Sequence, residues 1–334
     1  MTIFLFLIFL TFLIAYKVIA NSVIGTYIGL ARDFALPSTS RIITENGKIN
    51  ILIMGKGGVG HDAPDLTDTM ILASISTINK KMTLISIPRD IWIPKLSDRI
   101  NSAYMYGKQK EPKSGGLTLA KSITEEIVGV QIDYATTLDF NAFKEVIDAL
   151  HGITVDVKTE FTDTQYPIIG LEADNCNGDK TFACRYETIT FKAGLQNMDS
   201  TTALKFVRSR HANGVEGNDI AREVRQQLVI SAIIKKAITP QVFTNLGIDS
   251  KLLRIGSSSI ETDLKPSEEA TLARFMLNAK GDIKSYTIPD NLLYNPPNEY
   301  KYFNSIYTHA FVFIPKRSDG SWSDVQNWVQ EVLP

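Results

Sequence analysis

Four arginines lie close together in the second half of the chain, within a stretch of eighteen residues. The planar guanidinium of arginine forms two parallel hydrogen bonds with a phosphate, whereas lysine supplies only a point charge. The cluster therefore indicates phosphate or pyrophosphate binding, although the charge pattern alone favours a solvated, salt-bridged helix face. The four are Arg208, Arg210, Arg222 and Arg225, and the last two share a helix face because they are three residues apart.

A second cluster, earlier in the chain, is acidic. Asp62, Asp65 and Asp68, with His61, place up to four oxygen or nitrogen ligands within eight residues. Hard divalent cations such as Mg²⁺ prefer oxygen-rich sites of this type. An acidic surface loop is the alternative, and it is the commoner explanation for such a run in isolation.

The glycine-rich segment 55–60 follows a short apolar run and resembles two nucleotide-binding loops. The dinucleotide-binding loop opens a helix and has an acidic residue about twenty positions later, but here Pro64 and another strand follow. The ATPase loop needs a lysine and a serine or threonine where His61 and Asp62 stand. Both interpretations fail, and the segment is either a flexible turn or part of the wall of a site.

Composition excludes several classes of protein. The 334 residues are 44% hydrophobic and 21% charged, which is typical of a globular chain. Lys+Arg 35 against Asp+Glu 36 gives a net charge of −1, so a nucleic-acid partner is not expected. Strands and helices alternate without a clear break, which predicts one α/β domain from about residue 45 to the end.

The periodicity of apolar residues predicts the elements that hold these clusters. A helix is expected up to about Arg208 with Asp199 as its cap, and a longer helix through Ile238 with Asp219 as its cap and Ala221, Val224 and Leu228 on its inner face. A loop of about thirty residues is expected before residue 188. Strands are predicted at 49–54, 70–78, 82–87 (forming a hairpin with 70–78), 132–138, 153–157, 188–191 and 311–314, and further helices over 117–127, over 140–150, after Pro266 and at the C-terminus up to Val332.

The N-terminal segment is predicted to be a membrane anchor. Residues 2–16 are almost entirely Ile, Leu and Phe, and the apolar character resumes after Lys17 and continues to residue 31. A bilayer span needs about 20 apolar residues, so we expect an uncleaved transmembrane helix at 1–31, a linker at 32–44 and a soluble domain at 45–334. A cleaved signal peptide normally has a basic first region, and none precedes Phe4.

The chain has two cysteines, Cys176 and Cys184, in a polar loop. Their spacing alone does not decide between two alternatives, a small loop closed by a disulfide and two free thiols. Disulfides persist in oxidising compartments. Together with the anchor, the pair favours a domain outside the cytoplasmic membrane.

Two longer segments carry a resemblance to a known family. The runs Ser86–Asp90 and Arg99–Tyr104 resemble the opening signature of the LytR-CpsA-Psr family, and Gly194–Arg210 followed by Asp219, Arg222, Arg225, Gln226 and Gln227 is similar to its second signature. The similarity covers residues 49–236, and the pattern beyond 240 is less regular. It implies an α/β/α sandwich with a central mixed sheet and an apolar pocket for a polyprenyl tail.

The resemblance also implies a function. Members of the family are bacterial membrane-anchored phosphotransferases that act outside the cytoplasmic membrane and move a glycopolymer from polyprenyl pyrophosphate to peptidoglycan. The implied partners are that lipid-linked glycan, peptidoglycan and the membrane, and the implied cofactor is Mg²⁺ on Asp68. Asp90 either orients Arg89 or activates the acceptor hydroxyl. Pyrophosphate binding is assigned to Arg89, Arg208, Arg210, Arg222, Arg225 and Gln226.

The chain departs from the family pattern at the metal site. Gly57 stands where an aspartate is usual, and Leu66 stands where an arginine is usual. Asp62 or Asp65 is the candidate for the missing carboxylate, and Lys56 for the missing positive charge. Two other functions stay open: a non-catalytic polyprenyl-lipid-binding protein of the same fold, and a membrane-bound transcriptional regulator, which the balanced charge disfavours.

Overall fold

The computed structural model describes residues 46–171, 173–239, 241–242, 251–252, 254–256, 259–278, 282–297, 301–302, 305–306 and 311–334, together with Gly29, Arg32 and Ile42. The predicted anchor, 1–31, and the linker, 32–44, lie outside the described residues except for those three. None of the helices in the described ranges has both the length and the apolar character that crossing a bilayer requires.

A mixed six-stranded sheet forms the centre of the protein, as predicted. The strand order is β11-β6-β1-β2-β3-β12. The β1–β6 and β3–β12 pairs are parallel, and the other three pairs are antiparallel. The predicted hairpin is the β2–β3 pair. The strands are β1 (Lys48–Lys56), β2 (Thr67–Ser76), β3 (Met82–Ser86), β6 (Tyr134–Asp139), β11 (Ile260–Thr262) and β12 (Ile283–Thr287).

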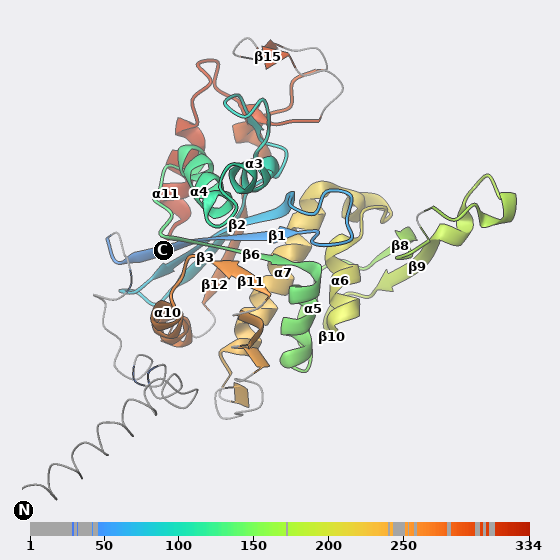
Figure 1. Cartoon of the computed structure of the whole chain (residues 1–334), viewed down its shortest axis with the longest axis horizontal. Coiled ribbons are helices and arrows are strands. Elements are labelled where there is room, and N and C mark those ends of the chain that lie inside the picture. The colour runs from blue at the N-terminus through green and yellow to red at the C-terminus, as the bar shows by residue number, and fades with distance from the viewer. Residues whose placement is uncertain are drawn as a thin grey trace, which may run out of the picture.

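Helices cover both faces of this sheet because its strands are apolar on both sides. In β1, Leu52 and Met54 pack against α3 (Ala103–Lys110), α4 (Gly115–Val128) and α11 (Ser323–Val332). Ile49 and Ile51 point to the other face, where they join a core that includes α7 (Asp219–Ala237) and α10 (Pro266–Asn278). Figure 1 shows α3, α4 and α11 on one side of the sheet and α10 on the other. The layers form the expected α/β/α sandwich.

A second apolar core lies beside the sheet and holds the arginine-bearing helices. Phe161, Phe191 and Phe206 form its aromatic centre, with ring centroids 5.0 to 5.9 Å apart. Asp199 caps α6 through the amide of Thr202, as predicted. The core is built from α5 (Phe140–Ala149), α6 (Ser200–Arg208), α7, β7 (Ile153–Val157), β8 (Phe161–Pro167), β9 (Tyr186–Phe191) and β10 (Gly194–Met198).

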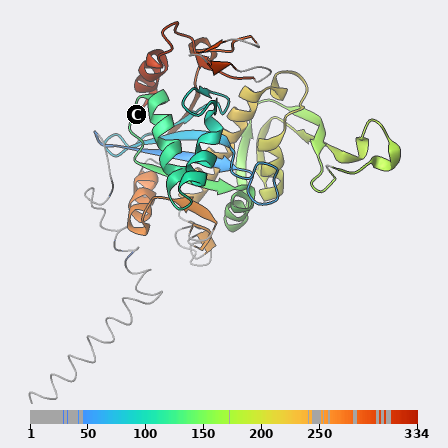
Figure 2. The same cartoon turned by 45° about the horizontal axis from the view of Figure 1, so that its top comes forward.

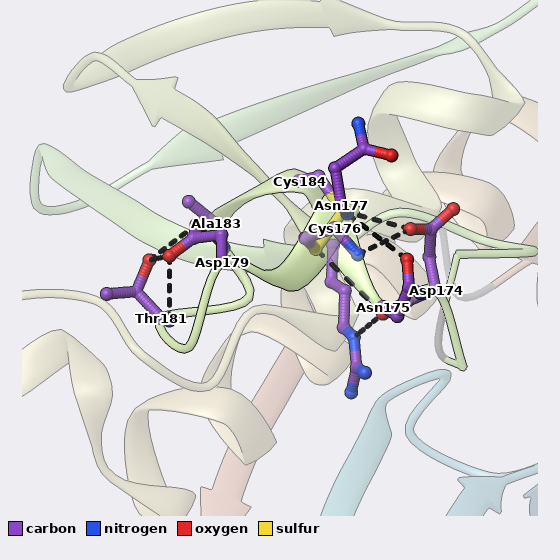
Figure 3. The surroundings of a disulfide bond; sticks show 9 residues. Asp174, Asn175, Cys176, Asn177, Asp179, Thr181, Ala183 and Cys184 are labelled. Carbon is purple, nitrogen blue, oxygen red and sulfur yellow. Dashed lines mark hydrogen bonds between the residues drawn. A yellow bond between two sulfur atoms is a disulfide. The ribbon is translucent and has the colours of Figure 1, made fainter.

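The prediction of a long loop before residue 188 is partly wrong, because this segment contains β8. This strand pairs antiparallel with β9, and an irregularity between Asp163 and Tyr166 interrupts the alternation that would reveal a strand in the sequence. The hairpin projects away from the sheet (Figures 1 and 2). Cys176 and Cys184 form a disulfide near the tip of this hairpin. Of the two alternatives that the cysteine spacing left open, the structure therefore has the disulfide-closed loop and not two free thiols. Figure 3 shows Asp174 and Asn175 beside this bond.

Helix α7 differs from its prediction in its cap and its inner face. Asn218, rather than Asp219, is the N-cap, since its side chain accepts a hydrogen bond from the Ala221 amide. Val224 is exposed, whereas Arg222 and Arg225 are buried. The apolar periodicity is right for Leu228, which packs against the second core, and wrong for Val224, because the first turns of α7 bury arginines instead.

The C-terminal part supports the segment that follows β3. A strand was predicted at 311–314, but the strand observed there is shorter than predicted. It is β16 (Ile314–Pro315), which pairs with β13 (Leu293–Tyr294). The amide of Phe313 donates to the carbonyl of Asp90 at 2.9 Å, and the amide of Trp92 donates to the carbonyl of Phe313 at 2.8 Å. The irregular C-terminal region thus fixes the backbone around Arg89 and Asp90.

Candidate functional site

The predicted site residues gather at one edge of the central sheet. Strands β1, β3 and β6 run in the same direction and end there, and the antiparallel β2 begins there. The acidic loop after β1, Asp68 in β2 and Arg89 after β3 are therefore close in space although they are distant in sequence. This is the edge at which α/β sheets usually bind ligands.

Arg89 and Asp68 form the first polar centre at this edge. The Nη1 atom of Arg89 lies 2.8 Å from Oδ1 of Asp68, and Nδ2 of Asn101 donates to the same oxygen at 3.3 Å. The Arg89 side chain is 15% exposed and the Asp68 side chain 54% exposed. An anion or a cation arriving from solvent can therefore reach the pair.

Asp90 lies beneath this centre and holds two arginines. Its Oδ1 is 2.8 Å from Nη1 of Arg99, and its Oδ2 is 3.4 Å from Nε of Arg89. The Asp90 side chain is only 8% exposed. Of the two roles expected for Asp90, this geometry favours the orientation of Arg89 over contact with an acceptor hydroxyl.

Asp65, predicted as a metal ligand, is instead paired with two lysines. Lys108 Nζ lies 2.8 Å from its Oδ1, and Lys56 Nζ lies 3.2 Å from the same oxygen. Burial alone would raise the pKa of Asp65, but the two ammonium groups outweigh it and hold the pKa below its usual value. Lys56 also donates to the hydroxyl of Tyr104 at 3.1 Å, and that hydroxyl donates to Glu261.

Phe140 connects the loop after β1 to the arginine cluster. Its ring lies edge-on to the ring of His61 at 5.1 Å, and the guanidinium carbon of Arg208 lies 4.8 Å from its centroid. Phe140 is the first residue of α5, directly after Asp139 at the end of β6. Arg208 is thereby brought to the same sheet edge as Asp68 and Arg89.

A polar cavity of about 300 Å³ opens at the start of α7. Arg222, which is only 6% exposed, and the exposed Arg210 both line this cavity. The N-terminal end of a helix adds partial positive charge. These features suit a phosphate. The lining residues are Arg210, His211, Gly217, Asn218 and Arg222.

Helix α7 is held against the end of β3. The side-chain amide of Gln227 donates to Oγ of Ser86 at 2.7 Å and to the carbonyl of Tyr286 at 2.5 Å. Since Ser86 is the last residue of β3, the turns of α7 before Gln227 extend beyond the sheet edge toward Arg89. Gln226, predicted to bind pyrophosphate, is half-buried on this part of the helix.

Arg225 is enclosed by protein groups. Its Nε donates to the carbonyl of Phe206 at 3.0 Å, its Nη2 to the carbonyl of Ser209 at 2.7 Å, and its Nη1 lies 2.9 Å from Oε2 of Glu216. The side chain is 2% exposed. Burial lowers the pKa of Arg225, and Glu216 opposes that effect. Arg225 therefore positions the chain that carries Arg208 and Arg210.

Asp163 is a site-supporting residue that the sequence analysis missed. It is fully buried in β8, and its Oδ2 accepts hydrogen bonds from Ser209 Oγ at 2.7 Å and from the amides of Arg210 and His211, both at 3.1 Å. Burial alone would raise the pKa of Asp163, but these hydrogen bonds and one from the Gln165 amide hold it below its usual value. In the sequence, Asp163 could have been recognised as an aspartate that lies two residues after the apolar Phe161 within a strand pattern.

Among the described residues, the three aspartates of the acidic loop do not bring their oxygen atoms close enough together to hold one metal ion. The group whose ligand atoms do lie that close is Asp174 with Cys176 and Cys184, and these two cysteines are joined in the disulfide. Asp62 is exposed, and Asp65 is neutralised by its two lysines. Asp68 keeps a solvent-facing carboxylate. Magnesium ions bound with substrate phosphates need only one or two protein carboxylates, so Asp68 fits such an ion and Asp65 does not.

The family model described as the LytR_cpsA_psr family matches residues 30–312. TagV of Bacillus subtilis (strain 168), a polyisoprenyl-teichoic acid–peptidoglycan teichoic acid transferase, is 27% identical over 304 residues, which are 86% of this chain and 68% of TagV.

Solved structures share the fold. The crystal structure of B. subtilis TagV has a TM-score of 0.59 at 23% identity and covers 87% of this chain and 98% of that chain. A structure of TagT bound to LIIa-WTA has a TM-score of 0.56 at 21% identity, with 89% of this chain and 96% of that chain covered. Because the family match extends over most of the sequence, this chain belongs to the LytR_cpsA_psr family.

Proposed function

We propose that this protein transfers a glycopolymer phosphate from a polyprenyl-pyrophosphate carrier to peptidoglycan. The proposal is carried by two arginine-bearing centres: the ion pair of Arg89 with Asp68, and the cavity lined by Arg210 and Arg222 at the start of α7, a helix that contacts the end of β3 through Gln227. The resemblance of the chain to TagV, named as a transferase between a polyisoprenyl-linked teichoic acid and peptidoglycan, supports it.

The residues fit a phosphoryl transfer. An acceptor hydroxyl on peptidoglycan attacks the phosphorus next to the sugar, the bond from that phosphorus to the bridging oxygen breaks, and the lipid monophosphate leaves with the electron pair. Such a reaction is accelerated mainly by positioned positive charge. Arg89, Arg208, Arg210 and Arg222 would supply that charge. A magnesium ion held by Asp68 would add further neutralisation of the phosphate oxygens.

The remaining residues of the site act through these four arginines. Asp90 orients Arg89, and Arg225 with Asp163 fixes the turn that carries Arg208 and Arg210. Their roles require no contact with the substrate. The apolar pocket expected for the polyprenyl tail is still a prediction, because the cavity at α7 is lined by polar groups.

The decisive experiment is transfer by the purified protein from a synthetic polyprenyl-pyrophosphate-linked disaccharide to nascent peptidoglycan, followed by mass spectrometry of the product. We expect wild-type transfer and a loss of at least about tenfold in Arg89→Ala, since a charged hydrogen-bond partner is worth about 1.5 to 3 kcal/mol. The matched control is Arg317→Ala, at an exposed arginine paired with Asp319. Lipid binding without any turnover would instead identify a non-catalytic lipid carrier.

We also propose that residues 1–31 anchor the protein by a single span and that residues 45–334 lie outside the cytoplasmic membrane. The Cys176–Cys184 disulfide supports an oxidising compartment. A reporter that is active only outside the membrane, fused after Pro334, should be active. Activity of a cytoplasmic reporter at the same point would reject this placement.

A further inference from the structure

The proposed transfer needs a group that removes the proton from the acceptor hydroxyl, and the inference below rests on that proposed function. As the new bond between oxygen and phosphorus forms, the hydroxyl must give its proton to a nearby base. Arginine cannot act as this base, because its guanidinium stays protonated. The base must therefore be a carboxylate or an imidazole at the same edge of the sheet.

Four carboxylates near this edge are engaged by other protein groups, and the exposed Asp62 does not line the cavity at α7. Asp90 is 8% exposed and has one oxygen toward each of two arginines. Asp65 lies between two lysines, and Asp163 is fully buried and accepts four hydrogen bonds. Asp68 is accessible, but its Oδ1 accepts from both Arg89 and Asn101.

His211 lines the cationic cavity together with Arg210 and Arg222. It is exposed, so a hydroxyl that approaches a phosphate in the cavity can reach it. Among the side chains that line this cavity, imidazole is the one that can take up a proton near neutral pH. Neither the motifs of the sequence nor the comparisons assigned this residue a role.

The backbone at His211 is held from two sides. Its amide donates to Oδ2 of Asp163, and the amide of Asn213, two residues later, donates to the carbonyl of Thr162 at 3.2 Å. Arg225 holds the carbonyl of Ser209, two residues earlier. The short turn between α6 and η5 (Gly214–Gly217) is therefore fixed against β8, which gives the backbone at His211 a defined position.

The charged groups on the surrounding elements are few. Both arginines, Arg210 and Arg222, line the cavity, Asp163 accepts hydrogen bonds, one of them from the His211 amide, and Glu216 of η5 forms its ion pair with Arg225.

We propose that His211 is the catalytic base of the transfer. One ring nitrogen takes the proton of the acceptor hydroxyl while the oxygen bonds to phosphorus. The bond from phosphorus to the bridging oxygen breaks, and the leaving lipid phosphate carries away the electron pair. The imidazolium then returns its proton to solvent, so the residue is unchanged at the end of the cycle.

The test is His211→Gln in the full-length protein, which keeps a polar side chain of similar size but removes the base. We expect kcat to fall by about 10² to 10⁴ while KM for the lipid-linked substrate stays within about threefold. The acidic limb of the kcat/KM profile against pH should disappear. Affinity for inorganic pyrophosphate, measured by calorimetry, should be unchanged, because the arginines remain.

His151→Gln is the matched control, since His151 is an exposed histidine in the turn after α5 and does not line the cavity. It should keep the wild-type rate and pH profile. The inference is overturned if His211→Gln retains the wild-type kcat, or if it loses pyrophosphate affinity in proportion to its rate with an unaltered pH profile. Absence of transfer in the wild type would refute the proposed function itself, which is a separate outcome.

Discussion

Arg225 donates from Nη2 to the carbonyl oxygen of Ser209 at 2.7 Å, so the middle of one helix holds the end of another. Arg222, three residues earlier on the same helix, lines the cavity instead. Two arginines that look equivalent in the sequence thus have different surroundings. Arg225 is enclosed by protein groups, whereas Arg222 is part of the cavity wall.

This difference predicts opposite effects of two alanine substitutions. Arg225→Ala should lower the free energy of unfolding by about 3 kcal/mol, because it leaves Glu216 and two carbonyls without their partner. Arg222→Ala should weaken pyrophosphate binding by about 10- to 150-fold, equivalent to 1.5 to 3 kcal/mol, because it removes a charged residue that lines the cavity. Urea unfolding and calorimetry measure the two quantities. Equal effects of both variants on binding, with both stable, would contradict the assignment.

Asp163 should make the stability depend on acidic pH. Its pKa in the folded protein lies below the usual value of about 4, so its contribution is present above pH 4 and is lost as pH falls through the folded pKa. Asp163→Asn should lower the free energy of unfolding by about 1.5 to 3 kcal/mol at neutral pH, and the difference from wild type should shrink below pH 4. A difference that stays constant from neutral to acidic pH would refute this linkage.

Asp68, Asp65 and Asp62 should respond differently to replacement by asparagine. Asp68→Asn should abolish magnesium-dependent transfer, because it removes the exposed carboxylate paired with Arg89 while keeping its shape. Asp65→Asn should lower stability through its two lysines and leave the dependence of the rate on Mg²⁺ intact. Asp62→Asn, at an exposed position, serves as the control. Full activity of Asp68→Asn, or wild-type transfer that survives chelation, would exclude the metal assignment.

The disulfide should stabilise the projecting hairpin more than the core. The chain-entropy model gives about 2.6 kcal/mol for a loop of this length. Replacing Cys176 and Cys184 by serine should therefore increase limited proteolysis between residues 168 and 185 while transfer activity stays near the wild-type rate. Thiol labelling of the wild type should be low until reductant is added. Full labelling without reductant would show that the bridge does not form.

Much of the fold follows from local patterns in the sequence. The apolar runs before Gly55 and around the turn at 79–81 predict β1, β2 and β3, and the 3.6-residue period predicts α4 and α5. Asp199 was identified as a cap because capping depends on neighbouring residues. Such features depend on interactions within a few residues, which a single sequence displays.

The supporting residues of the site depended on the tertiary structure. Asp163 and Ser209 are 46 residues apart in sequence, and only the packing of β8 against the turn after α6 brings them together. The prediction for the inner face of α7 is only partly right, because the burial of Arg225 depends on carbonyls and a carboxylate supplied by other segments.

The sequence by itself determined the arginine cluster, the acidic loop, the mixed α/β pattern and the family signatures. The tertiary structure decided which charged groups are available to a ligand. It paired Asp65 with lysines, enclosed Arg225 and left Asp68, Arg210 and His211 accessible. The physical reason is that the availability of a charge depends on its partners and burial in three dimensions, whereas the sequence specifies only the kind of charge.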